Sequence, residues 1–310
     1  MPSAEPRPGD GRHAGPTPAA GERAAVPETA HAPAASPRPS GLLRSAWLVF
    51  DLSVGLMLWS RRTIFMALVV AVPIAIAVAL RLLVALGAPI ARVGGTPLGG
   101  EAIFGLMVWV FYLRFIVPVL GAFYGTALIA DEVEEKTITY LFTRPVRRGA
   151  VLLGKYLAYL AATVFVVLPS LALVYLLVVP IDGHLGRAFP AFLTDLAVIG
   201  LGLAVYGAFF AFVGAWLKRP LLAGLFFVFG WEQAALAIPG YLRRVTIAWY
   251  LQGLVPHAMP AQPALTGLLQ DLFRDYPGLG TTLACLAGIW VVSLWLAVRV
   301  VERREYVLEQ

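Results

Sequence analysis

Residues 149–156 read GAVLLGKY and come within one residue of a nucleotide-binding motif. A P-loop reads G-x-x-x-x-G-K-[ST]: its backbone N–H groups hold phosphates, and its short Ser or Thr hydroxyl binds Mg²⁺. Here Tyr156 stands in the last position, and its phenol cannot replace that hydroxyl. The preceding TRPVRR is not an apolar strand. We therefore predict that the stretch binds no nucleotide, and we interpret Gly149 as a turn and Lys155 as an interfacial anchor.

Acidic residues gather just before this stretch, in LIADEVEEKTITYLFTRPVRR, residues 128–148. A short helix is predicted after them, with Ile138, Leu141 and Phe142 on its apolar side and Pro145 at its end. Acidic residues at the start of a helix and arginines at its end suit the helix dipole. Two interpretations stay open, namely a docking surface and a solvated loop with ordinary basic flanks. The acidic residues are Asp131, Glu132, Glu134 and Glu135.

Catalytic and metal-binding patterns are missing from the sequence. It contains neither HExxH nor GxSxG, and its single cysteine is Cys285. The histidines fall in the N-terminal tail or in loops, at His13, His31, His184 and His257, so none pair at metal-ligand spacing on a helix. We therefore predict no catalytic residue, no metal and no cofactor. The net charge of +6 indicates basic loops beside a membrane rather than a nucleic-acid partner.

The composition is that of a membrane protein, with 59% hydrophobic residues, 14% charged residues and a mean hydropathy of +0.79. Six apolar runs are long enough to cross ~30 Å of hydrocarbon, and each must be helical to satisfy its backbone hydrogen bonds in lipid. We expect an all-α polytopic membrane protein. Its six transmembrane helices are predicted near 63–87, 102–130, 151–180, 192–217, 221–239 and 279–300, with a long outer loop before the last.

The N-terminal region is predicted to have two parts. Residues 1–40 are rich in Ala, Pro and Gly and contain no aromatic residue, which favours a disordered tail. Apolar residues of 42–60 recur at helical spacing, although Arg44 and Asp51 interrupt the run. An N-terminal elbow helix lying in the membrane interface fits this segment best. A poor first span is the alternative.

Orientation follows from the Lys and Arg residues near the ends of the spans. One side carries the larger set, which is Arg61, Arg62, Arg144, Arg147, Arg148, Lys155, Lys218, Arg219, Arg299, Arg303 and Arg304. The other side carries Arg92, Arg187, Arg243, Arg244 and Arg274. We therefore predict that both termini and the 131–150 loop lie in the cytoplasm.

We single out three ionisable residues inside the apolar runs, Arg81, Arg114 and Glu232. Arg81 lies near the outer edge, where its side chain can reach the interface. Arg114 and Glu232 lie deeper, and a charge at the bilayer centre costs at least ~2.5–3.5 kcal/mol on insertion scales. They are intramembrane polar candidates. They line a substrate path, form an internal ion pair, or belong to a re-entrant helix.

The stretch from 131 to 155 resembles the cytoplasmic signature of ABC-2-type permeases, the membrane subunits of one class of ABC exporter. The matching positions are Glu132, Thr137, Tyr140, Leu141, Pro145, Arg147 or Arg148, Gly154 and Lys155. Lys136 departs from the pattern, which often has Gly before the Thr. The likeness extends over residues 42–304 and includes the elbow helix, the six spans and the long outer loop. Residues 41–310 would thus form a six-span permease domain.

The resemblance implies a division of labour. A separate ABC ATPase subunit would hydrolyse ATP and dock on the 131–148 segment, while two permease copies, identical or different, would hold the path in membrane lipid. The expected location is a bacterial plasma membrane, and the expected task is export. The alternative is an intramembrane enzyme or an assembly or maturation factor without transport. The expected coupling residues are Glu132, Glu135, Thr137, Pro145, Arg147 and Arg148.

Overall fold

The computed structural model describes residues 50, 61–87, 92–93, 96–97, 99–128, 148–181, 185–238, 241–255 and 277–303. All of them belong to the unit Pro39–Gln310. The predicted tail, nearly all of the predicted elbow helix and the segment 129–147 lie outside the described residues. The tail and the elbow helix therefore stay predictions.

The described residues are almost entirely helical, and six of their helices are long and apolar enough to cross a membrane. The all-α polytopic fold is thereby confirmed. The first span is α2 (Arg61–Ala85) and the second joins α3 (Gly100–Met107), η1 (Val108–Ile116), α4 (Val117–Leu120) and η2 (Gly121–Gly125). Between them, β1 (Arg92–Val93) pairs antiparallel with β2 (Thr96–Pro97).

The remaining spans follow in chain order. The third is α7 (Arg148–Val178), continued by η3 (Val179–Ile181), and the fourth is α8 (Leu185–Trp216). The fifth joins α9 (Pro220–Phe226), η4 (Phe227–Trp231) and α10 (Glu232–Ala237), and the sixth is α13 (Leu279–Arg303). Between the fifth and the sixth lie η5 (Tyr241–Val245) and α11 (Ile247–Gln252).

The helix α8 begins at Leu185, well before the run predicted from 192. Its 32 residues span ~48 Å at 1.5 Å per residue, which is more than the hydrocarbon thickness of ~30 Å. The apolar run marks only the part of the helix that lies at the depth of the lipid tails. The helix itself continues into the interface, where its more polar first turns contain Arg187 and Pro190.

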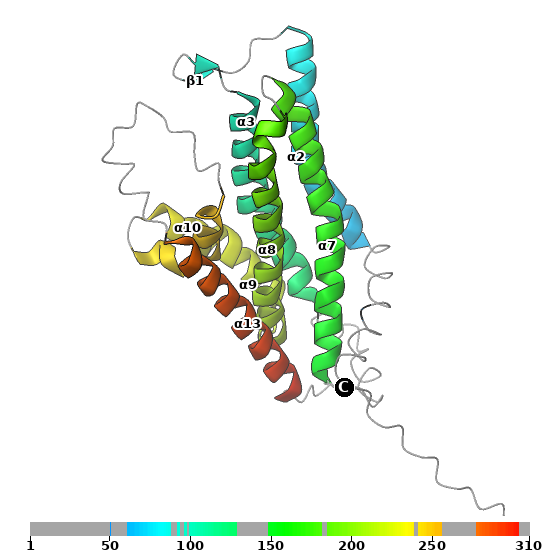
Figure 1. The fold of residues 1–310 in the computed structure, drawn as a ribbon. Helices are drawn as coiled ribbons and strands as arrows, with labels where there is room; N and C mark the ends of the chain where they lie inside the picture. The colour runs from blue at the N-terminus through cyan, green and yellow to red at the C-terminus, as the bar shows by residue number, and fades with distance from the viewer. Residues whose placement is uncertain are drawn as a thin grey trace, which may run out of the picture. The chain divides into compact units, whose positions relative to one another are not determined.

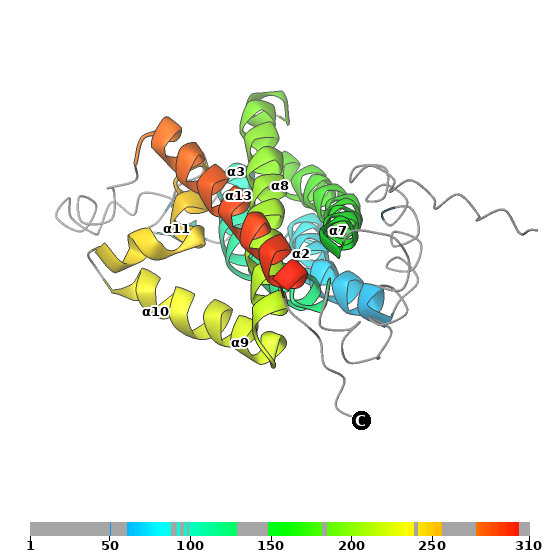
Figure 2. The ribbon, with the colours of Figure 1, turned by 90° about the horizontal axis from the view of Figure 1, so that it is seen from below.

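The long helix α8 is the centre of the packing, because it contacts α7, α13, α4, α9 and η2. Figure 2 shows α13 crossing α8, with α7 on one side of α8 and α9 to α11 on the other. Close approach depends on a glycine near the end of α8: a Cβ atom on Gly214 would lie 2.4 Å from the carbonyl oxygen of Thr126. Small residues at such crossings let helix backbones approach each other within a membrane.

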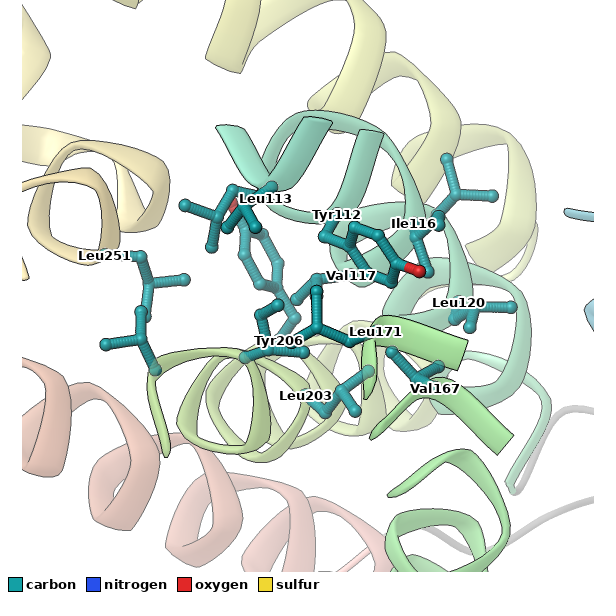
Figure 3. Close-up of a cluster of buried hydrophobic side chains, with 14 of the residues drawn as sticks. Tyr112, Leu113, Ile116, Val117, Leu120, Val167, Leu171, Leu203, Tyr206 and Leu251 are labelled. Atoms are coloured by element: carbon teal, nitrogen blue, oxygen red, sulfur yellow. The ribbon is translucent and has the colours of Figure 1, made fainter. Parts of the chain in front are cut away.

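Buried tyrosines hold the core together at several depths. Tyr112 of the second span hydrogen-bonds through its hydroxyl to Ser170 Oγ of α7 at 3.0 Å. Tyr159 of α7 donates its hydroxyl to the Leu203 carbonyl of α8 at 3.0 Å. Figure 3 shows Tyr112 and Tyr206 among the aliphatic side chains of the second, third and fourth spans and of α11. Since a buried hydroxyl without a partner is costly, these bonds fix which helices can pack together.

Candidate functional site

The predicted coupling residues fall mostly outside the described residues. Glu132, Glu135, Thr137, Pro145 and Arg147 belong to the segment 129–147, and Arg148 is the first residue of α7. That segment connects the end of the second span to the start of the third. The coupling role of these residues therefore stays a prediction.

The stretch that resembles a P-loop forms the first turns of α7. Gly149 is the second residue of this helix, so its predicted role as a turn is wrong. The helix continues through Gly149, and the missing side chain lets α7 pack closely on α13. A Cβ atom on Gly149 would lie only 2.9 Å from Val298 Cγ1. In a P-loop, the backbone N–H groups of this stretch would point at phosphates. In α7 the stretch is helical throughout, and both Gly149 and Gly154 are buried.

Glu232 is the most deeply buried of the polar candidates, with 1% of its surface exposed. It begins α10 directly after the π-helical segment η4. Its Oε1 atom accepts a hydrogen bond from the Tyr206 hydroxyl at 2.5 Å and another from the Ala248 backbone N–H at 3.0 Å. One carboxylate therefore joins the fifth span to the fourth span and to α11.

The short helix α11 is held at its start by two side chains. Thr246 is its N-cap, and the Thr246 Oγ1 atom accepts the Trp249 backbone N–H at 3.3 Å. Glu232 accepts a second N–H of the same first turn, that of Ala248. The first backbone N–H groups of a helix have no acceptor within the helix, and in α11 two of them donate to side-chain oxygens instead. The segment is well packed, and Leu251 is fully buried.

A second contact of α11 reaches the sixth span. Tyr250 of α11 neighbours Cys285 of α13, and the two side chains act on each other electrostatically. Burial raises the pKa of the Tyr250 phenol, and the neighbouring Cys285 raises it further. The thiol of Cys285 therefore sits where α11 and α13 meet.

Arg114 lies in η1 of the second span, and its guanidinium carbon is 4.5 Å from the centroid of the Trp109 ring. Its positive charge also acts on the Glu232 carboxylate. Arg114 lies within the π-helical η1, and Glu232 follows the π-helical η4. A π-helical turn changes the direction of the side chains that follow it and is frequent at functional sites. The two polar candidates thus lie within electrostatic reach of each other inside the protein.

The sequence analysis missed Asp195 of α8, which is fully buried. It lies inside the predicted span 192–217, so a lone acidic residue in an apolar run was the available signal. Within a membrane such a residue normally faces protein or water rather than lipid. Arg81, by contrast, is exposed near the end of α2, as expected for a side chain that reaches the interface.

Comparison with known proteins bears directly on this architecture. A search of curated proteins finds no match to the chain. A family model described as "ABC-2 family transporter protein" matches residues 53–304. The match covers all six spans and the polar site around Glu232. The chain therefore belongs to the ABC-2 family of transporter proteins and is a multi-pass permease subunit of an ABC transporter.

Proposed function

We propose that this permease subunit works in an ATP-driven exporter whose ATP is hydrolysed by a separate ATPase subunit. The observation that carries the proposal is the family match over residues 53–304, which contains all six spans. The helical state of residues 149–156 supports the same division of labour, because the stretch most like a nucleotide site is packed inside the permease. Two permease copies, identical or different, would enclose the path in membrane lipid.

The ATPase subunit would dock on residues 131–148. This segment connects two spans directly, so a displacement of the segment acts on both. Glu132 and Glu135 would attract basic or helix-end groups of the ATPase, while Thr137 and Pro145 would shape the segment and Arg147 and Arg148 would end it. Fully burying an apolar side chain of the segment in the contact would contribute ~1.5–3 kcal/mol.

We place the segment, both termini and the turn between α8 and α9 in the cytoplasm of a bacterial cell. Figure 1 shows the start of α7 and the end of α13 at one end of the helices and β1 at the other. The end at which α7 starts carries Lys218 and Arg219, in the turn between α8 and α9, and Arg303, the last residue of α13. An excess of such residues is typical of the cytoplasmic side.

Glu232 and Arg114 serve the path indirectly in this proposal. Glu232 accepts hydrogen bonds from Tyr206 and Ala248. These contacts favour a role in holding α11 in position over a role in binding a transported molecule. Arg114 supplies a compensating charge from the second span. Both residues would thus hold the outer part of the fifth span and α11 in place.

Co-purification tests the proposal. The tagged chain, co-expressed with a candidate ABC ATPase subunit, should retain that subunit in detergent, and native mass spectrometry should find two permeases and two ATPases. The complex should hydrolyse ATP, and replacing the P-loop lysine of the ATPase should abolish the activity. Recovery of the chain without the ATPase would instead favour the alternative, an intramembrane enzyme or an assembly factor.

A further inference from the structure

The first turns of α7 are where three spans meet. Leu152 of α7 packs in a small buried cluster with Ala215 of α8 and with Ala297 and Val301 of α13. One turn earlier, Gly149 lies against Val298 of α13, as described above. The stretch GAVLLGKY thus joins the start of the third span to the ends of the fourth and the sixth.

Tyr156, the residue that departs from the P-loop motif, continues this junction. Its hydroxyl donates a hydrogen bond to the Ala204 carbonyl oxygen of α8 at 2.8 Å. The same hydroxyl accepts a hydrogen bond from Trp290 Nε1 of α13 at 2.7 Å. The side chain is 2% exposed. A single buried oxygen atom therefore links the third, fourth and sixth spans.

We propose that residues 149–156 transmit the movement of the coupling segment to α8 and α13, with Tyr156 as the positioning residue. The inference rests on the proposed function, because the movement would begin when the ATPase displaces residues 131–148. That displacement would reach the third span at Arg148, the first residue of α7. The contacts of Gly149 and Leu152 then carry it sideways to α13.

The two hydrogen bonds of Tyr156 differ in kind from the apolar contacts beside them. A hydrogen bond is directional and is lost once donor and acceptor separate beyond ~3.5 Å, so it fixes the relative position of two helices more narrowly than apolar packing does. Without the Tyr156 hydroxyl, the Trp290 N–H also loses its acceptor within the protein. Tyr156 therefore keeps the three helices in register, so that α8 and α13 follow when α7 moves.

The chain contains its own reporter of this movement. Cys285 is the single cysteine, it lies on α13 with Trp290, and it neighbours Tyr250 of α11. A shift of α13 relative to α11 changes the access of a reagent to this thiol. The rate of alkylation by N-ethylmaleimide is therefore measured on the complex with the ATPase subunit, without nucleotide and with Mg·ATP and orthovanadate.

In the unmodified complex we expect nucleotide to change the alkylation rate about fivefold or more, which is the lower end of usual coupling between distant sites. Tyr156→Phe and Trp290→Phe should each reduce this change to less than twofold, and the double variant should lose no more than either single variant. Tyr112→Phe is the matched control. It removes an equally buried hydroxyl, the partner of Ser170, from a hydrogen bond that does not involve α13, and it should leave the nucleotide response unchanged.

The outcomes separate the inference from the proposed function. A complex that hydrolyses ATP but alkylates Cys285 at one rate in both states would overturn the inference alone. Retention of the full response in Tyr156→Phe would do the same, and so would an equal loss in Tyr112→Phe, which would mark a general effect of stability. A chain that binds no ATPase would overturn the proposed function and the inference with it.

Discussion

The Glu232 carboxylate and the Tyr206 hydroxyl lie 2.5 Å apart, deep between the fifth and fourth spans. The same carboxylate oxygen holds the Ala248 N–H of α11. An acidic residue that would be costly in lipid thus becomes the joint of three elements. Its hydrogen bonds, rather than apolar packing alone, decide where α11 lies.

Removing this joint should destabilise the protein in graded steps. Tyr206→Phe should lower the free energy of unfolding by about 1–3 kcal/mol, because it removes one partner of a buried acceptor. Glu232→Ala should cost more, since it leaves both the Tyr206 hydroxyl and the Ala248 N–H without an acceptor. Glu232→Gln keeps an acceptor oxygen and should cost least. Unfolding followed by circular dichroism in mixed micelles measures the order, and an equal effect of all three variants would contradict it.

Two glycines of α8 provide a matched test of helix packing. Gly214→Ala should lower the free energy of unfolding by about 1–3 kcal/mol, because the new methyl group would meet the Thr126 backbone. Gly200→Ala should leave stability unchanged or raise it by up to ~1 kcal/mol, since nothing lies within 4 Å of its Cβ position and alanine favours helix. The same unfolding assay compares them. A larger loss in Gly200→Ala would show that α8 does not pack as described.

The isolated chain should bind no ATP, even when its motif is completed. Tyr156→Ser turns GAVLLGKY into a full match to the P-loop pattern, but it leaves the helix α7 and the packing of Gly149 and Leu152 against α13 and α8 in place. Fluorescent ATP-analogue binding to the purified chain should therefore stay at background in both forms. Saturable, Mg²⁺-dependent binding that Lys155→Ala abolishes would refute this prediction.

Coupling should depend on the acidic start of the docking segment. The double variant Glu132→Ala with Glu135→Ala should insert and express normally but retain less ATPase subunit, or show slower ATP hydrolysis in the complex. The pair Glu22→Ala with Glu28→Ala, in the predicted tail, changes the net charge equally and should have no effect. If the first pair assembles and turns over normally, the two acids form a solvated face, where each contributes roughly 0–1 kcal/mol.

Orientation can be read by cysteine labelling in a Cys285→Ala background. A membrane-impermeant thiol reagent added outside intact cells should label cysteines placed at Gly183 or Gln262. It should fail to label cysteines placed at Arg148 or Lys218 until the cells are permeabilised. The expectation follows from the excess of basic residues on the side of Arg148 and Lys218. The reverse pattern would place both termini outside.

Much of this architecture is written into local stretches of sequence. Six apolar runs predicted six spans, because crossing ~30 Å of hydrocarbon is a requirement on length and composition that each run meets by itself. Tyr156 argued against a nucleotide site from its chemistry alone. The signature from 131 to 155 indicated the ABC-2 family, to which the chain belongs.

The partners of polar groups were decided only by the tertiary structure. Gly149 read as a turn from its neighbours, yet it is a helical contact with α13. No local pattern assigned Tyr206 and Ala248 to Glu232, or Trp290 to Tyr156, and Asp195 passed unnoticed in its apolar run. The physical reason is that entry into lipid depends on each helix separately. A buried hydrogen bond depends instead on which helices approach and on how their turns, including the π-helical turns of the second and fifth spans, direct each side chain.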